Sequence, residues 1–275
     1  GRLRTTSAKS PESSVASRGA RERGASMGLE FAEEVAILRM DFGKANAIGD
    51  AFLQKMSALL EEVAARKARA LVLTGDGRIF CAGLDLPALL DRGAEEIGAF
   101  VDRFSTFMLR VFELPIPVVA AIDGHAVAGG CVLALQTDFR VMSAGTIGLN
   151  EVRIGVGLPA VVLETLRLQV SPSSLRTIAL EGRLFEPDAA LAIGLVDEVV
   201  PPDRLMSRAM DKARDLASVP PVAFARIKQS LRAQVAEAAR RGAASDKKVW
   251  ATGFASPETQ TILREVVERL RRKRG

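Results

Sequence analysis

The hydrophobic positions follow two alternating periods along the first 200 residues. Short apolar runs such as Ala70–Thr74 and 118–122 end at glycine-containing turns and predict buried strands. The segments 50–66 and 95–114 instead repeat apolar residues at helical spacing, with Asp50 as the expected N-cap of the first. This alternation indicates an α/β core. Further strands are expected at 35–42, 139–143 and 195–200, and further helices at 128–135, 159–169, 172–181 and 187–193.

The two ends of the chain differ from this core. Beyond residue 201 the pattern is helical, with expected breaks near Pro220, Gly242 and Pro257. Residues 1–26 are rich in Ser, Arg, Ala and Gly and have no apolar periodicity, which favours a disordered arm or a leader remnant. We therefore expect an arm over 1–26, a core over 27–200 and a helical region over 201–275. No apolar run reaches the roughly 18 residues needed to cross a bilayer, so no membrane segment is expected.

Charge and composition narrow the classes of function. The segments 1–26 and 264–274 each carry six basic and two acidic side chains, so the body between them is slightly acidic. Basic ends could meet nucleic acid or cofactor phosphates. However, the chain has no Tyr and one Trp, and this scarcity of stacking side chains argues against nucleic-acid binding. Two cysteines are too few for a disulfide framework and favour a reducing compartment.

Two glycine-containing junctions carry candidate backbone donors. Residues 80–86 (FCAGLDL) form a small-residue turn whose N–H groups can point outward; the alternative is a plain turn in which Asp85 caps a helix. At 123–131 a strand runs through Gly129 and Gly130 into an apolar helix, and free N–H groups at a helix start attract anions. The Lys-Ser/Thr ending of a phosphate-binding loop is missing here. Close helix-to-strand packing is the alternative interpretation.

A third junction carries a carboxylate. Glu151 stands alone in the apolar, Gly- and Pro-containing stretch 147–159. Burial there would raise its pKa and suit it to general acid/base work near neutral pH. A surface pair between Glu151 and Arg153 is the alternative that the residues leave open.

Other reactive side chains are interpreted as structural. His125, the only histidine, is expected to support its turn rather than to catalyse. Cys81 and Cys131 have no histidine partner in a recognisable arrangement, so a thiolate nucleophile is not expected. Asp138 and Arg140 are expected to pair with each other, and no metal-ligand spacing is present.

In this order and spacing, the three junctions resemble the crotonase (enoyl-CoA hydratase/isomerase) superfamily from about residue 35 to residue 275. The resemblance implies a spiral of ββα repeats followed by C-terminal helices that pack in homotrimers or dimers of trimers. It also implies that the N–H groups of Leu84 and Gly129 bind a thioester oxygen and that Glu151 is the acid/base. Coenzyme A would be part of the substrate, with no separate cofactor and no metal. The residues implied in binding the CoA ester are Cys81, Ala82, Gly83, Asp85, Leu86, Gly130, Asn150 and Phe254.

One departure from the family pattern suggests the reaction. Hydratases of this superfamily place a glutamate where Val132 stands, and a second one at the position of Glu151. The stretches FCAGLDL, AGGC, IGLNE and LFEPDAALAIGLVDEVVP resemble the mitochondrial 3,2-trans-enoyl-CoA isomerase branch, which keeps only the later glutamate. Isomerisation of 3-enoyl-CoA to trans-2-enoyl-CoA is therefore expected.

Two other classes of function stay open. One is hydration or another crotonase chemistry at the same site, and the other is a non-catalytic, RNA-binding crotonase homologue. A bacterial-type cytoplasmic location is expected, with the mitochondrial matrix as the alternative.

Overall fold

The computed structural model describes residues 27–43 and 45–272, so the arm predicted over 1–26 lies outside the described residues. Its strands form two sheets. A six-stranded sheet has the order β1-β2-β3-β5-β7-β9, and a three-stranded sheet has the order β4-β6-β8. All strand pairs within these sheets are parallel except β1 with β2. The strands are β1 (Gly28–Ala32), β2 (Val35–Arg39), β3 (Ala70–Thr74), β4 (Ile79–Cys81), β5 (Val118–Asp123), β6 (His125–Val127), β7 (Phe139–Ala144), β8 (Ile147–Gly148) and β9 (Glu198–Val199).

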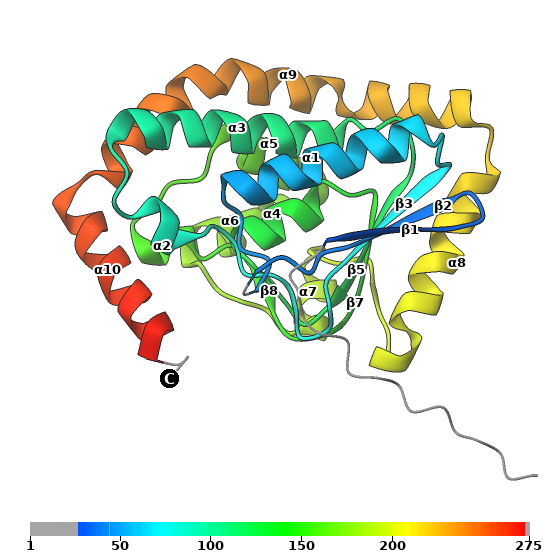
Figure 1. Cartoon of the computed structure of the whole chain (residues 1–275), viewed down its shortest axis with the longest axis horizontal. Coiled ribbons are helices and arrows are strands. Elements are labelled where there is room, and N and C mark those ends of the chain that lie inside the picture. The colour runs from blue at the N-terminus through cyan, green and yellow to red at the C-terminus, as the bar shows by residue number, and fades with distance from the viewer. Residues whose placement is uncertain (1–26, 44, 273–275) are drawn as a thin grey trace, which may run out of the picture.

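Helices surround the sheets, and those of the last third of the chain wrap around the core (Figure 1). None of the described helices combines the length and the apolar character that crossing a membrane requires. The helices are α1 (Asp50–Ala65), α2 (Leu86–Leu89), α3 (Ala94–Phe112), α4 (Gly129–Leu135), α5 (Ala160–Gln169), α6 (Pro172–Glu181), α7 (Pro187–Ala192), α8 (Leu205–Ser218), α9 (Pro221–Phe254) and α10 (Pro257–Arg272), with 3-10 turns η1 (Glu151–Ile154) and η2 (Pro202–Arg204).

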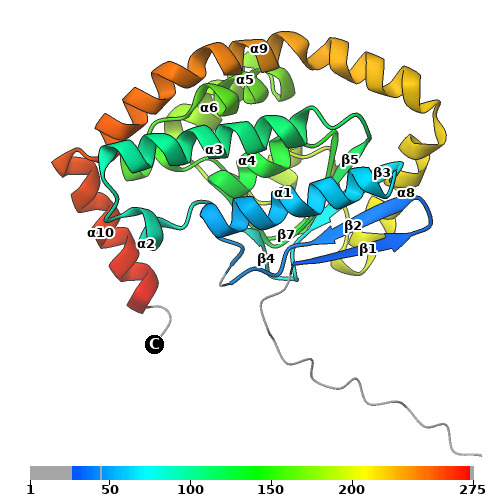
Figure 2. The same ribbon diagram turned by 45° about the horizontal axis from the view of Figure 1, so that its top comes forward.

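The large sheet buries both of its faces, as its continuous apolar strands predict. Along β3, Leu71 and Leu73 point into the main core beneath α1, α3 and α4, whereas Ala70 and Val72 point to the opposite face. Helix α8 covers that opposite face, so the helical region is packed directly on the sheet (Figure 2). The predicted α/β architecture with a helical C-terminal region is confirmed. Strands β2 and β9 are shorter than their apolar runs.

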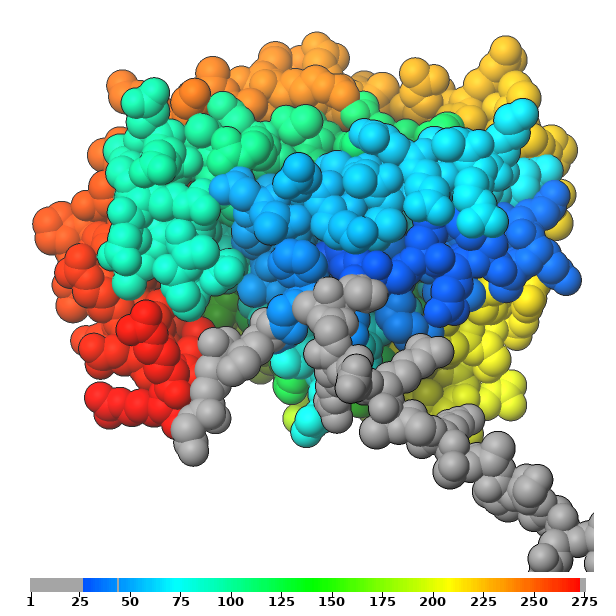
Figure 3. Space-filling view, viewed as in Figure 1, coloured from blue at the N-terminus to red at the C-terminus, as the bar shows by residue number. Residues whose placement is uncertain are grey.

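The predicted break near Gly242 is wrong. Helix α9 continues from Pro221 to Phe254 and lies across α3 and α5 along one side of the molecule (Figure 3). A Cβ added at Gly242 would lie 2.3 Å from the Cβ of Ala160 on α5. Gly242 is therefore a point of close approach between α9 and α5 and not a helix end. The breaks predicted near Pro220 and Pro257 are confirmed.

The predicted pair between Asp138 and Arg140 is also wrong. The Arg140 guanidinium lies 2.9 Å from the Asp197 carboxylate. Asp138 instead pairs with Lys228 at 2.6 Å and with Arg232 at 2.7 Å, both on α9. Asp138 lies just before β7 and reaches α9, whereas Arg140 lies within the strand and pairs with Asp197 just before β9.

The α5–α9 contact can be tested with two substitutions in the same helix. We expect Gly242→Ala to lower the free energy of unfolding by about 1–3 kcal/mol, because the methyl group overpacks the contact with Ala160. A Cβ at Gly253 meets nothing within 4 Å, so Gly253→Ala should stabilise α9 by up to about 1 kcal/mol. Urea unfolding of the two variants measures both effects. Equal changes in the free energy of unfolding of the two variants would contradict the close contact between α5 and α9.

Candidate active site

The small parallel sheet brings the three predicted junctions together. Cys81 of β4 is in register with Ala126 of β6, and Val127 of β6 is in register with Gly148 of β8. Each strand then runs directly into one of the junctions, at 82–84, 128–130 and 150–151. Because the carboxyl ends of parallel strands meet at one edge of a sheet, segments far apart in sequence share one site.

The first two junctions touch through their backbones. A Cβ added at Gly83, where φ is +92°, would lie 2.9 Å from the carbonyl oxygen of Val127 and 3.2 Å from the nitrogen of Gly129. A Cβ at Gly130 would lie 2.1 Å from the carbonyl oxygen of Cys81. Only glycine at positions 83 and 130 permits this approach.

Two N–H groups at this contact, those of Leu84 and Gly129, have no backbone acceptor among the described residues. The Ile48 N–H donates to the Gly83 carbonyl at 2.8 Å, and the Asp85 N–H donates to the Ile48 carbonyl at 3.0 Å, which leaves the Leu84 N–H between them unused. Gly129 is the first residue of α4, where an N–H has no acceptor within its own helix. Over the part of the chain that the structure describes, neither N–H donates to a backbone group.

Ala128 holds the second junction in a strained conformation. Its φ of 50° and ψ of −120° lie in a region that favours glycine. The Ala128 N–H donates to the Gly148 carbonyl, and the Ala128 carbonyl accepts from the Val132 N–H, each at 2.9 Å. Strain of this kind costs about 1–3 kcal/mol and persists only where the surrounding structure enforces it.

Glu151 is the one carboxyl among the described residues that line the cavity at these junctions. It begins η1, and its side chain is only 7% exposed. Burial raises the pKa of Glu151 to about 7, because removing water disfavours the charged form. Among the described residues its Oε2 atom has no hydrogen-bond partner. The alternative pair with Arg153 does not form, since the Arg153 Nε donates to the Gly182 carbonyl at 2.8 Å.

A small cavity joins Glu151 to the backbone donors. Its free volume is about 10 Å³, and its other walls are almost entirely apolar. Leu84, Gly129 and Val132 are the walls that the sequence motifs identified. Pro159, the last residue of the stretch 147–159, is a further wall directly before α5. The walls that the sequence motifs do not indicate come from α3, α5 and α9; they are Phe100, Val101, Phe104, Val162 and Trp250. The helical spacing of Phe100 and Phe104 indicates one face of α3, but nothing local indicates that this face meets Glu151.

The remaining predicted binding residues lie in different surroundings. Asp85 caps α2 by accepting from the Ala88 N–H at 3.4 Å, and Leu86 begins that helix. Ala82 donates its N–H to the Ala45 carbonyl at 3.0 Å. The Asn150 Oδ1 atom is buried without a partner among the described residues. Phe254 is buried in the core of the chain and is not one of the cavity walls.

Neither cysteine offers a thiolate. Burial raises the pKa of Cys81 to about 12 and raises that of Cys131 as well, so both thiols stay protonated near neutral pH. His125 is exposed, and its Nδ1 lies 2.9 Å from the Thr146 hydroxyl, in keeping with a supporting role in the turn.

Asn46 is a positioning residue that the sequence motifs did not reveal. Its buried side chain accepts from the Phe42 N–H at 2.7 Å and donates to the carbonyls of Met40 at 3.1 Å and Phe80 at 3.0 Å. The Cys81 thiol also lies 3.0 Å from the Asn46 carbonyl. These bonds tie the loop before α1 to β4, directly before the first junction.

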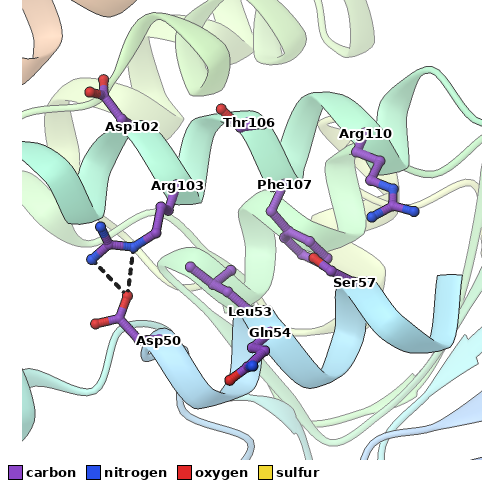
Figure 4. Close-up of a pocket in the computed structure, with 9 residues that line it drawn as sticks. All are labelled: Asp50, Leu53, Gln54, Ser57, Asp102, Arg103, Thr106, Phe107 and Arg110. Atoms are coloured by element: carbon purple, nitrogen blue, oxygen red, sulfur yellow. Dashed lines mark hydrogen bonds and ion pairs between the residues drawn. The ribbon is translucent and has the colours of Figure 1, made fainter. Parts of the chain in front are cut away.

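A separate open depression lies between α1 and α3 (Figure 4). Asp50 does not cap α1 as predicted: Gly49 occupies the cap position, and the Asp50 carboxylate binds Arg92 and Arg103 at 2.7 and 2.8 Å. The Asp50 carboxylate thus pairs with these two arginines and does not accept from the N–H groups at the start of α1. None of the residues lining this depression lines the Glu151 cavity.

The fold is that of the crotonase superfamily. The structure superposes on the crystal structure of human mitochondrial delta3-delta2-enoyl-CoA isomerase with a TM-score of 0.86 and 27% identity, covering 90% of this chain and 99% of that one. Residues 30–273 match the enoyl-CoA hydratase/isomerase family, and the chain belongs to this family of acyl-CoA-processing enzymes.

Relatives named as isomerases and relatives named as hydratases are both similar to the chain. Human mitochondrial enoyl-CoA delta isomerase 1 is 28% identical over 246 residues, which are 88% of this chain and 82% of the relative. The crystal structure of an enoyl-CoA hydratase from Mycobacterium ulcerans is 31% identical, with a TM-score of 0.77 over 82% of this chain and 98% of that one. Similarity of this degree shows the family and leaves the reaction to be argued from the site.

The strain at Ala128 predicts a stabilising substitution. Ala128→Gly should raise the free energy of unfolding by up to about 2 kcal/mol, because relief of roughly 1–3 kcal/mol of strain exceeds the entropy cost of glycine. Ala126→Gly makes the same change two residues earlier, in β6, where φ is not positive, and should destabilise the protein. Thermal unfolding compares the two. A loss of stability in both variants would contradict the strain.

The raised pKa of Glu151 predicts a pH-dependent stability. Its carboxyl titrates near 4.5 when unfolded and near 7 when folded, so the native state binds more protons between these values and its stability falls as pH rises. Glu151→Gln removes this loss. We expect the variant to match the wild type at pH 5 and to exceed it by about 3 kcal/mol at pH 8, measured by urea unfolding. A constant difference across pH would contradict the shifted pKa.

Proposed function

We propose that the protein isomerises 3-enoyl-CoA esters to trans-2-enoyl-CoA esters, with Glu151 as the single acid/base. The observation that carries this proposal is the composition of the cavity walls. Glu151 is the one carboxyl among the described residues that line it, and Val132 faces the same cavity from α4 with an exposure of 1%. A valine there cannot orient or deprotonate water, whereas a proton shift within the substrate needs one carboxyl.

The backbone donors would carry the substrate carbonyl. The free N–H groups of Leu84 and Gly129 would donate to the thioester oxygen, which becomes negatively charged when a proton leaves C2. One donor of this kind typically contributes about 3–4 kcal/mol to stabilising such a transition state. The surrounding turn, with Cys81, Ala82, Gly83, Asp85, Leu86 and Gly130, would line the path of the CoA moiety.

Glu151 would move the proton. As a carboxylate it takes the proton from C2, and the electron pair spreads over the dienolate to the thioester oxygen. The protonated carboxyl then returns the proton to C4, so the double bond moves from C3–C4 to C2–C3 and Glu151 is regenerated. A pKa near 7 suits both halves of this cycle, since neither form is strongly favoured at neutral pH.

Hydration is the second candidate, favoured by the hydratase name of the M. ulcerans relative. It would require Glu151 alone to take a proton from water and to supply one at C2. Measuring the rates of isomerisation and of hydration side by side distinguishes the two reactions.

We expect trans-3-hexenoyl-CoA to be isomerised faster than crotonyl-CoA is hydrated. Glu151→Gln should lower the isomerisation rate by at least the roughly 10²–10⁴-fold that general acid/base catalysis supplies, while binding of the CoA ester survives. The wild-type kcat/KM should rise with pH and level off above about 7, since the carboxylate is the active base. Double-bond migration and hydration are followed separately. Faster hydration of crotonyl-CoA would overturn the assignment.

We further propose that the protein assembles as a trimer or a dimer of trimers. Apolar side chains are exposed near the start of α9 and beside it, and burying them would favour association. They are Leu168, Val219, Val222, Ile227 and Leu231. Light scattering at micromolar concentration should report an assembly with a multiple of three chains. The double variant Ile227→Glu, Leu231→Glu should form assemblies with fewer chains. A monomeric wild type would contradict this proposal.

A further inference from the structure

Trp250 places a large ring and an unused donor at the Glu151 cavity. The side chain lies on α9, lines the cavity and is 7% exposed. Its Nε1–H is buried and has no hydrogen-bond partner among the described residues. A buried donor without an acceptor costs about 1–3 kcal/mol, and a buried indole N–H usually has a partner. Trp250 is therefore a buried wall of the cavity whose position is set by the packing of its ring and not by a hydrogen bond within the described residues.

The space beside the ring is too small for a long acyl chain. A free volume of about 10 Å³ holds roughly one water molecule. Phe100, Phe104 and Trp250 all line the cavity and are all packed into the main core. Among the described residues, Trp250 is the one wall that α9 contributes, so its ring bounds the cavity on the side of that helix.

Helix α9 packs closely against α3 and α5, and the Asp246 carboxylate of α9 accepts from the Ala160 N–H of α5 at 2.7 Å. A Cβ added at Gly98 of α3 would lie 2.8 Å from the Cγ of Lys247, one turn before Trp250. Gly242 makes the corresponding contact with Ala160 of α5. Outward movement of α9 would break this hydrogen bond and the packing against both helices, so the backbone that carries Trp250 is positioned by its neighbours.

We propose that Trp250 is the residue that determines acyl-chain length, by restricting the site to short acyl groups. This inference rests on the proposed function for the identity of the substrate. Removing the ring should open the cavity towards α9 and admit longer chains, without touching Glu151 or the backbone donors.

Binding can be measured independently of catalysis, because Trp250 is the only tryptophan and the chain has no tyrosine. Saturated esters cannot isomerise, so their effect on the fluorescence of the wild type reports occupation of this cavity alone. Butyryl-CoA should change the emission, and CoA without an acyl group should not. Decanoyl-CoA should bind at least about tenfold more weakly than butyryl-CoA. Equal affinities, or no response to butyryl-CoA, would overturn the proposal.

Catalysis provides the second measurement. The wild-type kcat/KM should favour trans-3-hexenoyl-CoA over trans-3-decenoyl-CoA by at least about tenfold, and Trp250→Ala should remove this preference. Trp250→Phe keeps an aromatic ring and should retain most of the preference for the shorter ester. This variant replaces Trp250→Ala in the test if the alanine variant does not fold. Val249→Ala changes the exposed neighbour on α9 and should leave the ratio unchanged. An unchanged ratio in Trp250→Ala would overturn the proposal.

The two measurements separate this inference from the proposed function. If neither unsaturated ester is isomerised but fluorescence still ranks the saturated esters by length, the reaction is wrong and the role of Trp250 stands. If isomerisation is fast for both chain lengths, the reaction stands and the role of Trp250 is wrong.

Discussion

The contact between two backbone turns is the constraint on which the site depends. Strands β4 and β6 end side by side only because Gly83 and Gly130 leave no side chain between the turns that follow them. That approach places the Leu84 and Gly129 N–H groups around one small space. Strand β8 pairs with the other side of β6 and brings Glu151 to the same edge. A single methyl group at either glycine would separate the donors from each other and from the carboxyl.

Helix α9 completes the site by a different kind of interaction. Near its start, Lys228 and Arg232 are buried against Asp138, and Arg232 also donates to the Gln136 and Thr137 carbonyls at 3.1 and 3.2 Å. Burial lowers the pKa of Lys228 to about 8, against the opposing effect of Asp138. Buried charges with several acceptors specify position more than they add stability. Charge thus aligns one part of α9, and glycine contacts hold the part that carries Trp250.

The parts of the fold that the sequence predicts are those with long or strongly apolar patterns. Helices α1 and α3 and strands β3 and β5 follow directly from their spacing. Strands β4, β6 and β8 have two or three residues each, too few to show a period, although they build the site. The sequence wrongly predicts a helix end at Gly242, because a glycine inside a helix and a glycine at a helix end give the same local pattern. The packing partner Ala160 explains why a glycine stands inside this helix.

The same division applies to the site itself. Glu151 and the glycine junctions are local signals, so the sequence identifies them. The walls contributed by Phe100 and Trp250 depend on which helix faces meet after folding. Phe254 lies one turn beyond Trp250 on the same face of α9 and is buried in the same core, but it does not line the cavity, because the partners packed against each turn come from elsewhere in the chain.

The conformation of Ala128 has a consequence for how the free energy of the protein is distributed. A residue in a glycine-like conformation is held there by the completed fold, so its cost is met when the chain folds rather than when a ligand arrives. The fold therefore positions the backbone around the Gly129 N–H in the empty protein. Under the proposed function, little rearrangement would remain for the moment at which negative charge develops at the Leu84 and Gly129 N–H groups. The interaction energy of the substrate would then be available for selecting and holding it.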